Sequence, residues 1–119
     1  MFQVMPESAG NIMGVRATGK LTDQDYQFLI PDLEALITKY GKVRLLCFMD
    51  EAFAGLEAGA FWDDAKFFLP HRADFEKMAA VGGPKWVELA MKLFAPLLKG
   101  DYQTFSGDQL AEAWEWIKS

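Results

Sequence analysis

Residues 43–49 read VRLLCFM, a nearly continuous run of apolar side chains. A run of this kind is typical of a strand that other elements cover on both faces, as happens inside a parallel sheet. The segments before and after it have the spacing of helices rather than of strands. The run therefore predicts an α/β fold with residues 43–49 as the central strand.

The segment before this strand has the pattern of an amphipathic helix that begins after Thr22. The Thr22 side chain can accept a hydrogen bond from a free backbone amide three residues later, and Asp25 stands at the reciprocal position of a capping box. Gly41 is expected to end the helix, and Phe28 and Pro31 fall off its buried stripe. The stripe repeats at intervals of three and four residues and consists of Tyr26, Leu29, Ile30, Leu33, Leu36, Ile37 and Tyr40.

The other elements follow from turn and capping residues. Strands are predicted at residues 2–5, 12–18, 77–81 and 102–105, and helices at about 55–69, from Pro84 onward, and from Ser106 to Lys118. The first two strands form a hairpin, since turn-forming residues separate them. The order β-β-α-β-α-β-α-β-α predicts a mainly parallel five-stranded sheet with an N-terminal β-hairpin and four helices. We expect a single domain over residues 1–119, which is close to the commonest domain size.

Composition and charge exclude several classes of function. The net charge of −5 argues against nucleic-acid binding, which needs basic groups that displace counterions. Cys47 is the only cysteine, which excludes an internal disulfide and a multi-cysteine metal site, and it is expected to be a buried small hydrophobe. No signal peptide is visible, and no apolar run reaches the roughly 20 residues of a membrane-spanning helix. We expect a cytoplasmic location and no cofactor.

Four stretches of the chain carry a resemblance to a known family. They are AFWDDAKFF (60–68), His71-Arg72, EKMAAVGG (76–83) leading to Trp86, and EAWEWI (112–117). On these stretches the chain resembles the SpoIIAA-like family, a branch related to STAS domains, over nearly its whole length. The resemblance implies a small bacterial domain whose helices lean against a sheet, as they also do in lipid-binding domains of the Sec14 (CRAL-TRIO) type. It implies binding of an apolar ligand or a membrane surface, and no established chemistry.

One segment departs from the signalling STAS domains. Those domains carry a Ser or Thr at the start of the helix after the central strand, where phosphorylation controls partner binding. Here residues 50–55 read DEAFAG, which offers no hydroxyl group to modify. A phosphorylation switch of the anti-sigma-antagonist kind is therefore not expected.

The second predicted helix is rich in aromatic side chains. Helical geometry gives it one broad apolar face, expected to pack on the sheet, which consists of Phe61, Trp62, Ala65, Phe68 and Leu69. Phe67 falls on the opposite side, between Asp63 and Asp64, where an exposed position is normally polar. The simpler interpretation is that these rings complete a core or a dimer contact. The alternative is a ligand groove or a membrane-facing edge.

The third predicted helix has an apolar arc of roughly 200°, more than one contact with a sheet requires. The arc includes Trp86 and Phe94, and Lys85, Lys92 and Lys99 follow one another at intervals of seven residues on the opposite face. This combination is typical of a helix that lies on an anionic bilayer. An ordinary solvated face on a helix shared between two neighbours is the simpler interpretation.

The candidate polar site consists of Asp50, Glu51, His71, Gly82 and Gly83. The two glycines can present backbone amides to an anion, although a tight turn explains them more simply. Paired carboxylates can bind a metal or act in acid–base chemistry, although acids near the start of a helix have a simpler explanation in the helix dipole. His71 is the sole histidine, and a cation suits the end of the second helix. No catalytic residue and no metal site is predicted.

The leading hypothesis is a non-catalytic binding module. It holds a small apolar or amphipathic, lipid-like ligand between the second and third helices and contacts the inner membrane surface peripherally. The expected contact residues are Phe61, Trp62, Phe67, Phe68, Trp86 and Phe94, with Lys85 and Lys92 directed toward anionic head groups. The alternative is a STAS-type protein–protein adaptor or homodimer that uses the same helices without a phosphorylation switch. An enzyme is the third and weakest hypothesis.

Overall fold

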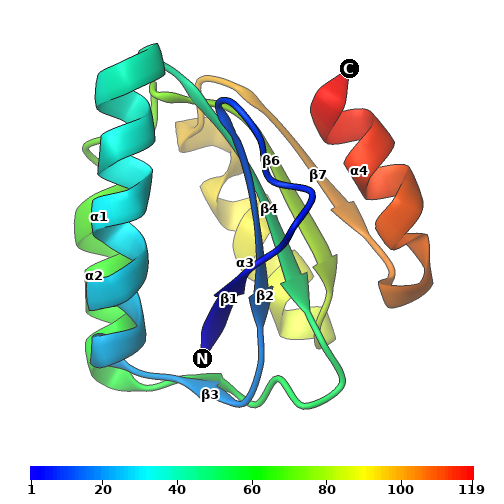
Figure 1. Ribbon diagram of the computed structural model, residues 1–119. Coiled ribbons are helices and arrows are strands. Elements are labelled where there is room, and N and C mark those ends of the chain that lie inside the picture. The colour runs from blue at the N-terminus through cyan, green and yellow to red at the C-terminus, as the bar shows by residue number, and fades with distance from the viewer.

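The computed structural model describes residues 1–119 and contains a five-stranded sheet with the strand order β1-β2-β4-β6-β7 (Figure 1). Its strands are β1 (Phe2–Val4), β2 (Ile12–Ala17), β4 (Val43–Met49), β6 (Phe75–Gly82) and β7 (Asp101–Phe105). The first two pair antiparallel as a hairpin, and every other neighbouring pair is parallel. The predicted sheet is therefore confirmed, with β4 in its centre.

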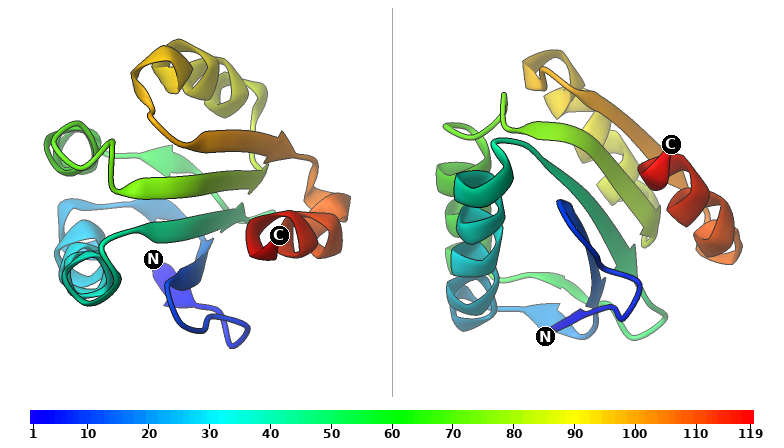
Figure 2. Two further views of the ribbon diagram at one scale, coloured as in Figure 1. Left: turned by 90° about the horizontal axis from the view of Figure 1, so that it is seen from above. Right: turned by 45° about the horizontal axis from the view of Figure 1, so that its top comes forward.

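Four α-helices cover the two faces of this sheet (Figure 2). They are α1 (Asp23–Tyr40), α2 (Ala58–Phe68), α3 (Lys85–Phe94) and α4 (Leu110–Lys118), with short 3-10 helices at Ala95–Leu97 and Gly107–Gln109. α1 and α2 lie side by side on one face, and α3 approaches the same face through Val87 and Met91. α4 lies on the opposite face, over Leu46, Ala79 and Val81.

Alternation along β4 explains why both faces are covered. Val43, Leu45 and Met49 pack in the clusters formed with the α1–α2–α3 side, whereas Leu46 packs under α4. Successive side chains of a strand point to opposite faces, so a strand that is apolar at nearly every position needs cover on both. The unbroken run in residues 43–49 thus has the structural cause that its pattern predicted.

The ends of α1 lie where the sequence predicts them. The backbone N–H of Asp25 donates to the Thr22 hydroxyl at 3.3 Å, and the backbone N–H of Thr22 donates to the Asp25 carboxylate at 2.8 Å. Gly41 follows the last turn with a φ of 79°, which favours glycine. Phe28 and Pro31 are exposed, so the predicted capping box and end of the helix are confirmed. The predicted stripe is correct except at Tyr40, which is 44% exposed in the last turn.

A second, two-stranded sheet has no counterpart in the prediction. It pairs β3 (Lys20–Leu21) with β5 (Gly55–Leu56) in parallel. Gly55 has a φ of 103°, and the next residue but one, Glu57, donates its backbone N–H to the Leu21 carbonyl at 2.9 Å. Because these bonds hold residues 55–56 extended, α2 begins at Ala58 and not at residue 55 as expected.

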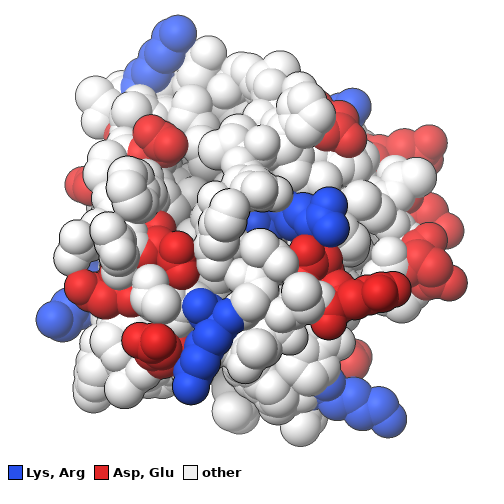
Figure 3. All heavy atoms as spheres, turned by 60° about the horizontal axis from the view of Figure 1, so that its bottom comes forward, with Lys and Arg blue, Asp and Glu red and all other residues white.

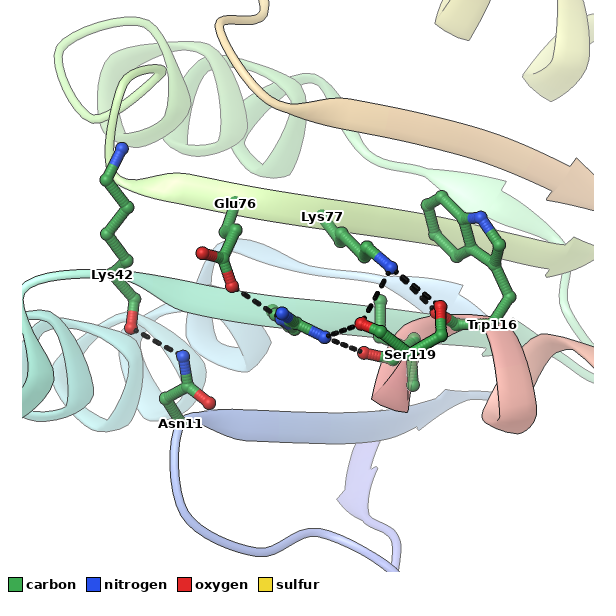
Figure 4. A network of polar contacts seen from close by, with 8 residues as sticks. Asn11, Lys42, Glu76, Lys77, Trp116 and Ser119 are labelled. Atoms are coloured by element: carbon green, nitrogen blue, oxygen red, sulfur yellow. Dashed lines mark hydrogen bonds and ion pairs between the residues drawn. The ribbon is translucent and has the colours of Figure 1, made fainter.

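Two basic side chains of the sheet hold the C-terminal end of α4 (Figure 4). Arg44 of β4 donates to the main-chain oxygen of Ser119 at 2.8 Å and pairs with Glu76 at 2.6 Å. Lys77 of β6 donates to the main-chain oxygens of Trp116 and Ser119, both at 3.1 Å. Cations at a helix C-terminus interact favourably with its exposed carbonyls. These contacts fix α4 on the face of the sheet that α2 and α3 do not occupy.

Candidate functional site

α3 is the one α-helix that contains no buried residue. Its apolar side chains Trp86, Leu89, Leu93 and Phe94 are exposed, and Leu93 keeps 80% of its surface. Contiguous exposed apolar side chains on a small domain mark surfaces that bind something. The packing of α3 is therefore incomplete, and apolar space remains between this helix, α2 and the sheet.

That space is a cavity of about 230 Å³, partly open to solvent, which we call the α2–α3 groove. Hydrophobic residues make up 24 of the 26 that line it, and the other two are Asp64 and Arg72. The lining residues come from α1 (Tyr26, Leu29), from α2 and the segment after it (Phe61, Asp64, Ala65, Phe68, Leu69, Arg72), from α3 and the segment after it (Trp86, Val87, Ala90, Met91, Phe94, Leu97, Leu98), from the five-stranded sheet (Phe2, Val15, Leu45, Cys47, Met49, Met78, Ala79, Ala80) and from the region of β3 and β5 (Leu21, Phe53, Leu56). A mostly apolar cleft with a few placed polar groups is the usual form of a small-molecule site.

Four of the predicted contact residues line the groove, namely Phe61, Phe68, Trp86 and Phe94. Trp86 also packs near the segment before α2, with its ring centroid 6.4 Å from that of Phe53. α2 and α3 therefore supply aromatic rings from both sides, in the place that the sequence predicted.

Trp62 lies outside the groove. It is 61% exposed, and its ring centroid lies 6.1 Å from that of Phe61. Phe61 and Leu69 are exposed as well, so the predicted face packs on the sheet only in part, through Phe68, whose ring centroid lies 4.9 Å from that of Phe75. The physical reason is that the groove separates the rest of this face of α2 from α3 and the sheet.

Phe67 is the clearest correction, because it is buried and not exposed. Only 6% of its surface remains accessible, and its ring contacts those of Phe68, Phe75 and His71 at centroid distances of 5.1, 6.2 and 4.7 Å. The side of α2 that carries Phe67 faces α1 and the sheet, because Ala60 on the same side is also fully buried. Phe67 thus belongs to the core and does not line the groove.

Asp64 shares this inward side of α2 and was not among the predicted site residues. Its Oδ1 accepts a hydrogen bond from the Tyr26 hydroxyl at 3.0 Å. Burial among apolar groups raises the pKa of Asp64 to about 6, although the Tyr26 bond opposes the shift. Ala60, Asp64 and Phe67 follow one another at helical spacing, so all three lie on one side of α2.

Tyr26 and Cys47 line the groove beside Asp64. Burial raises the pKa of the Cys47 thiol to about 12, and the carboxylate of Asp64 adds to the shift. Burial and the same carboxylate also raise the pKa of Tyr26. Both groups therefore stay neutral at physiological pH, so Cys47 is not a reactive thiolate, although it is half-buried and not fully buried as expected.

Asp50 does not stand at the start of a helix, so the helix dipole does not explain it. Its carboxylate accepts from Arg16 Nε at 2.9 Å and from the backbone N–H of Ala52 at 3.0 Å. The hydrogen bond from Arg16 holds the pKa of Asp50 below its usual range. Glu51 is exposed in the same turn. Asp50 therefore ties the end of β4 to β2.

His71 lies at the opposite end of the sheet from Asp50. Its Nδ1 is 2.8 Å from a carboxylate oxygen of Asp74, just before β6 begins. Asp50 follows the end of β4, and β4 and β6 run parallel. The structure therefore does not bring the two predicted polar residues together.

Gly82 and Gly83 form a tight turn between β6 and α3. Their φ values are 75° and 82°, and a Cβ on Gly82 would lie 2.6 Å from the Met49 carbonyl oxygen. Pro84 is the N-cap of α3 and not its first residue as predicted. A second cavity of about 390 Å³ lies here, and Lys85 lines it together with both glycines. Lys85 therefore points to this cavity and not to the groove.

Charge is distributed unevenly over the molecule. Figure 3 shows acidic side chains on both sides of the face in view, with the denser group on the side where Figure 1 shows α4. α4 carries Glu112 and Glu115, whereas α3 carries Lys85 and Lys92 with Glu88 between them. Lys92 is exposed, and its Nζ lies 3.8 Å from the Glu88 carboxylate. The basic groups on α3 thus face solvent outside the groove.

No three His, Cys, Asp or Glu side chains come together as they would to hold a metal ion. No helix has the length and hydropathy that crossing a membrane requires.

Comparison with known proteins agrees with the architecture. An uncharacterised DUF3478 protein from Shewanella loihica PV-4 with a SpoIIAA-like fold has a TM-score of 0.76 and 25% sequence identity, over 98% of this chain and 92% of that one. The anti-sigma factor antagonist SpoIIAA in its unphosphorylated form has a TM-score of 0.64 over 100% of this chain and 99% of that one. At 11% identity this second likeness concerns the fold alone.

No match was found among curated proteins. The family model described as SpoIIAA-like matches residues 12–118, nearly the whole chain. This match confirms the resemblance carried by the second helix, the β6 turn and the last helix. The chain belongs to the SpoIIAA-like family.

Proposed function

We propose that this protein is a non-catalytic binding module that holds a small amphipathic, lipid-like ligand in the α2–α3 groove. The observation that carries the proposal is the groove itself, an apolar cavity of about 230 Å³ between two helices, reached from solvent. Its volume lies a little below the roughly 300–1,000 Å³ of common ligand pockets. A single alkyl chain of medium length is therefore the class of ligand that fits best.

The driving force for such binding is the removal of apolar surface from water. Phe61, Trp86 and Phe94 each keep between 39% and 50% of their surface exposed. Covering that surface, together with the surface of an alkyl chain, is favourable by about 25 cal/mol for each Å² buried. Because the groove is already open to solvent, an alkyl chain can enter it without rearrangement of the core.

A fluorescence titration tests the proposal. The neutral apolar probe N-phenyl-1-naphthylamine is expected to bind the wild-type protein with enhanced emission. Its dissociation constant should lie in the micromolar range, which corresponds to a binding free energy on the order of −7 to −8 kcal/mol. Ala90 lines the groove on α3, so an Ala90→Trp side chain fills the space that the probe needs. This variant is expected to weaken binding by about tenfold or more.

Leu93→Trp is the matched control. Leu93 lies on the same helix, is 80% exposed and does not line the groove, so this variant should bind the probe as wild type does. Failure of the wild type to bind the probe, or equal loss in both variants, would contradict a ligand site in the groove.

The exposed side of α3 extends the proposal to a peripheral contact with the membrane. Leu89 and Leu93 project apolar surface away from the groove, and Lys85 and Lys92 are exposed on the same helix. An apolar stripe beside lysines is attracted to anionic lipid head groups.

A flotation assay at low salt tests this contact. The wild type should float with vesicles that contain anionic lipid, and Leu93→Asp should remain unbound. Equal flotation of both proteins would exclude this contact.

The second candidate is a protein–protein regulatory adaptor or homodimer. What supports this candidate is that one protein with the same fold is an anti-sigma factor antagonist. The groove supports the ligand proposal instead. In an adaptor, Trp62 and Leu93 would be covered by a partner or a second copy. Light scattering distinguishes the two, since a stable dimer that Leu93→Asp dissociates supports the adaptor. A monomer that binds the probe supports the ligand proposal.

A further inference from the structure

The α2–α3 groove contains one acidic group deep among apolar side chains and one basic group at its margin. Asp64 is partly buried, and the only protein group that donates to it is the Tyr26 hydroxyl, at 3.0 Å from Oδ1. Arg72 is exposed, and its Nη1 donates to the Leu69 carbonyl at 2.8 Å. The second carboxylate oxygen of Asp64 is thus free to accept a hydrogen bond from a molecule in the groove.

We propose that Asp64, oriented by Tyr26, is the polar anchor of the groove and selects amphipathic ligands whose polar end donates hydrogen bonds, alkyl amines above all, over ligands that end in a carboxylate. This inference rests on the proposed ligand-binding function of the same groove. It adds the chemical class of the ligand, which the apolar walls alone do not specify.

The charges that line the groove favour this class. Its titratable residues are Tyr26, Cys47, Asp64 and Arg72. Tyr26 and Cys47 are neutral at pH 7.5, whereas Asp64 with a pKa of about 6 is mostly ionised. An ionised carboxylate in apolar surroundings attracts an ammonium group and repels a second carboxylate, and the low local polarity strengthens both effects.

The Tyr26 hydroxyl orients the Asp64 carboxylate in the groove. Tyr26 is buried in the core with its ring 5.2 Å from that of Phe2, so its hydroxyl is held in place. By donating to Oδ1 it fixes the plane of the Asp64 carboxylate and leaves the other oxygen for the ligand. Preformed polar groups of this kind determine the orientation of a ligand in an otherwise apolar pocket.

Displacement of N-phenyl-1-naphthylamine at pH 7.5 tests the inference. Decylamine, decanol and decanoic acid, each below its micellar concentration, share a chain and differ in the polar end. We expect decylamine to bind at least about tenfold more tightly than decanoic acid, since a hydrogen bond to a charged group is worth about that factor, with decanol between them. In Asp64→Asn the two affinities should become equal within about twofold.

Asp63→Asn is the matched control, because Asp63 is the neighbouring residue and does not line the groove. It should keep the preference of the wild type. The preference of the wild type tests the inference by itself, without any variant. Equal displacement by all three amphiphiles would show that Asp64 does not select the polar end of the ligand and that the groove is an unselective site. Tighter binding of decanoic acid would overturn it in favour of recognition by Arg72, and no binding of the probe would overturn both the anchor and the proposed function.

Discussion

Replacing Phe75 with alanine is expected to lower the free energy of unfolding by about 3–5 kcal/mol, the usual cost of truncating a buried phenylalanine. Phe75 opens β6, is only 2% exposed and packs against Phe67 and Phe68 of α2 at centroid distances of 6.2 and 4.9 Å. Its loss leaves a cavity between α2 and the sheet, which the surrounding core cannot fully close. Denaturant titration measures the change.

The effect of Phe75→Ala also concerns the groove. Phe68 lines the groove on one side and stacks on Phe75 on the other, so Phe75 supports one wall. Phe28→Ala is the control, because Phe28 is 73% exposed, and it should change the free energy of unfolding by no more than about 0.5 kcal/mol. A loss below about 1 kcal/mol for Phe75→Ala would contradict the packing of α2 described above.

Replacing Asp64 with asparagine is expected to stabilise the protein at pH 7.5, by up to about 3 kcal/mol. Burial raises the pKa of this carboxyl from an ordinary 3.8 to about 6 in the folded chain. Well below pH 3.8 the Asp64 carboxyl is protonated in both the folded and the unfolded chain and costs no stability. As pH rises from about 4 to 6, the Asp64 carboxyl ionises more readily in the unfolded chain than in the folded one, so the free energy of unfolding falls. Above pH 6 the full loss of stability remains.

Asparagine has no such cost and can still accept the hydrogen bond from Tyr26. The stabilisation should therefore shrink as pH falls from 7 to 4, which thermal unfolding at several pH values measures. Asp32→Asn, at an exposed position of α1, should show no comparable gain. A destabilised Asp64→Asn, or a difference that does not change with pH, would contradict the apolar environment assigned to Asp64. Such a stability cost is common for groups that are poised to bind a ligand.

The elements of the sheet were predictable because their signals are local. The run in residues 43–49 and the caps at Thr22 and Gly41 depend on alternation, side-chain-to-backbone bonds and backbone conformation within a few residues. The β3–β5 pair was not predictable in this way, since two-residue strands carry no periodic pattern. Their pairing joins segments more than thirty residues apart in the chain.

The groove was predictable in outline and not in detail. Excess aromatic residues on the second and third helices predicted apolar space between them, and Phe61, Phe68, Trp86 and Phe94 do line it. The prediction for Phe67 was wrong because α2 has two apolar sides, and hydropathy alone does not say which one faces the sheet. That choice depends on where α1 and α3 pack, which is a tertiary contact.

The same ambiguity is the reason that Asp64 was not predicted to line the groove. A carboxylate between aromatic residues on a helix is ordinarily read as part of the solvated face. It lies inward because the neighbours on its side, Ala60 and Phe67, are the ones that fit against α1 and the sheet. Its partner Tyr26 comes from a different helix, so no spacing within α2 indicates the pair.

The most direct test of a binding role for this chain is the probe titration on wild type, Ala90→Trp and Leu93→Trp side by side. Binding to the wild type and to Leu93→Trp, with a loss of about tenfold or more in Ala90→Trp, is the result that a ligand site between α2 and α3 predicts. A probe that fails to bind, or that binds all three proteins equally well, would contradict it.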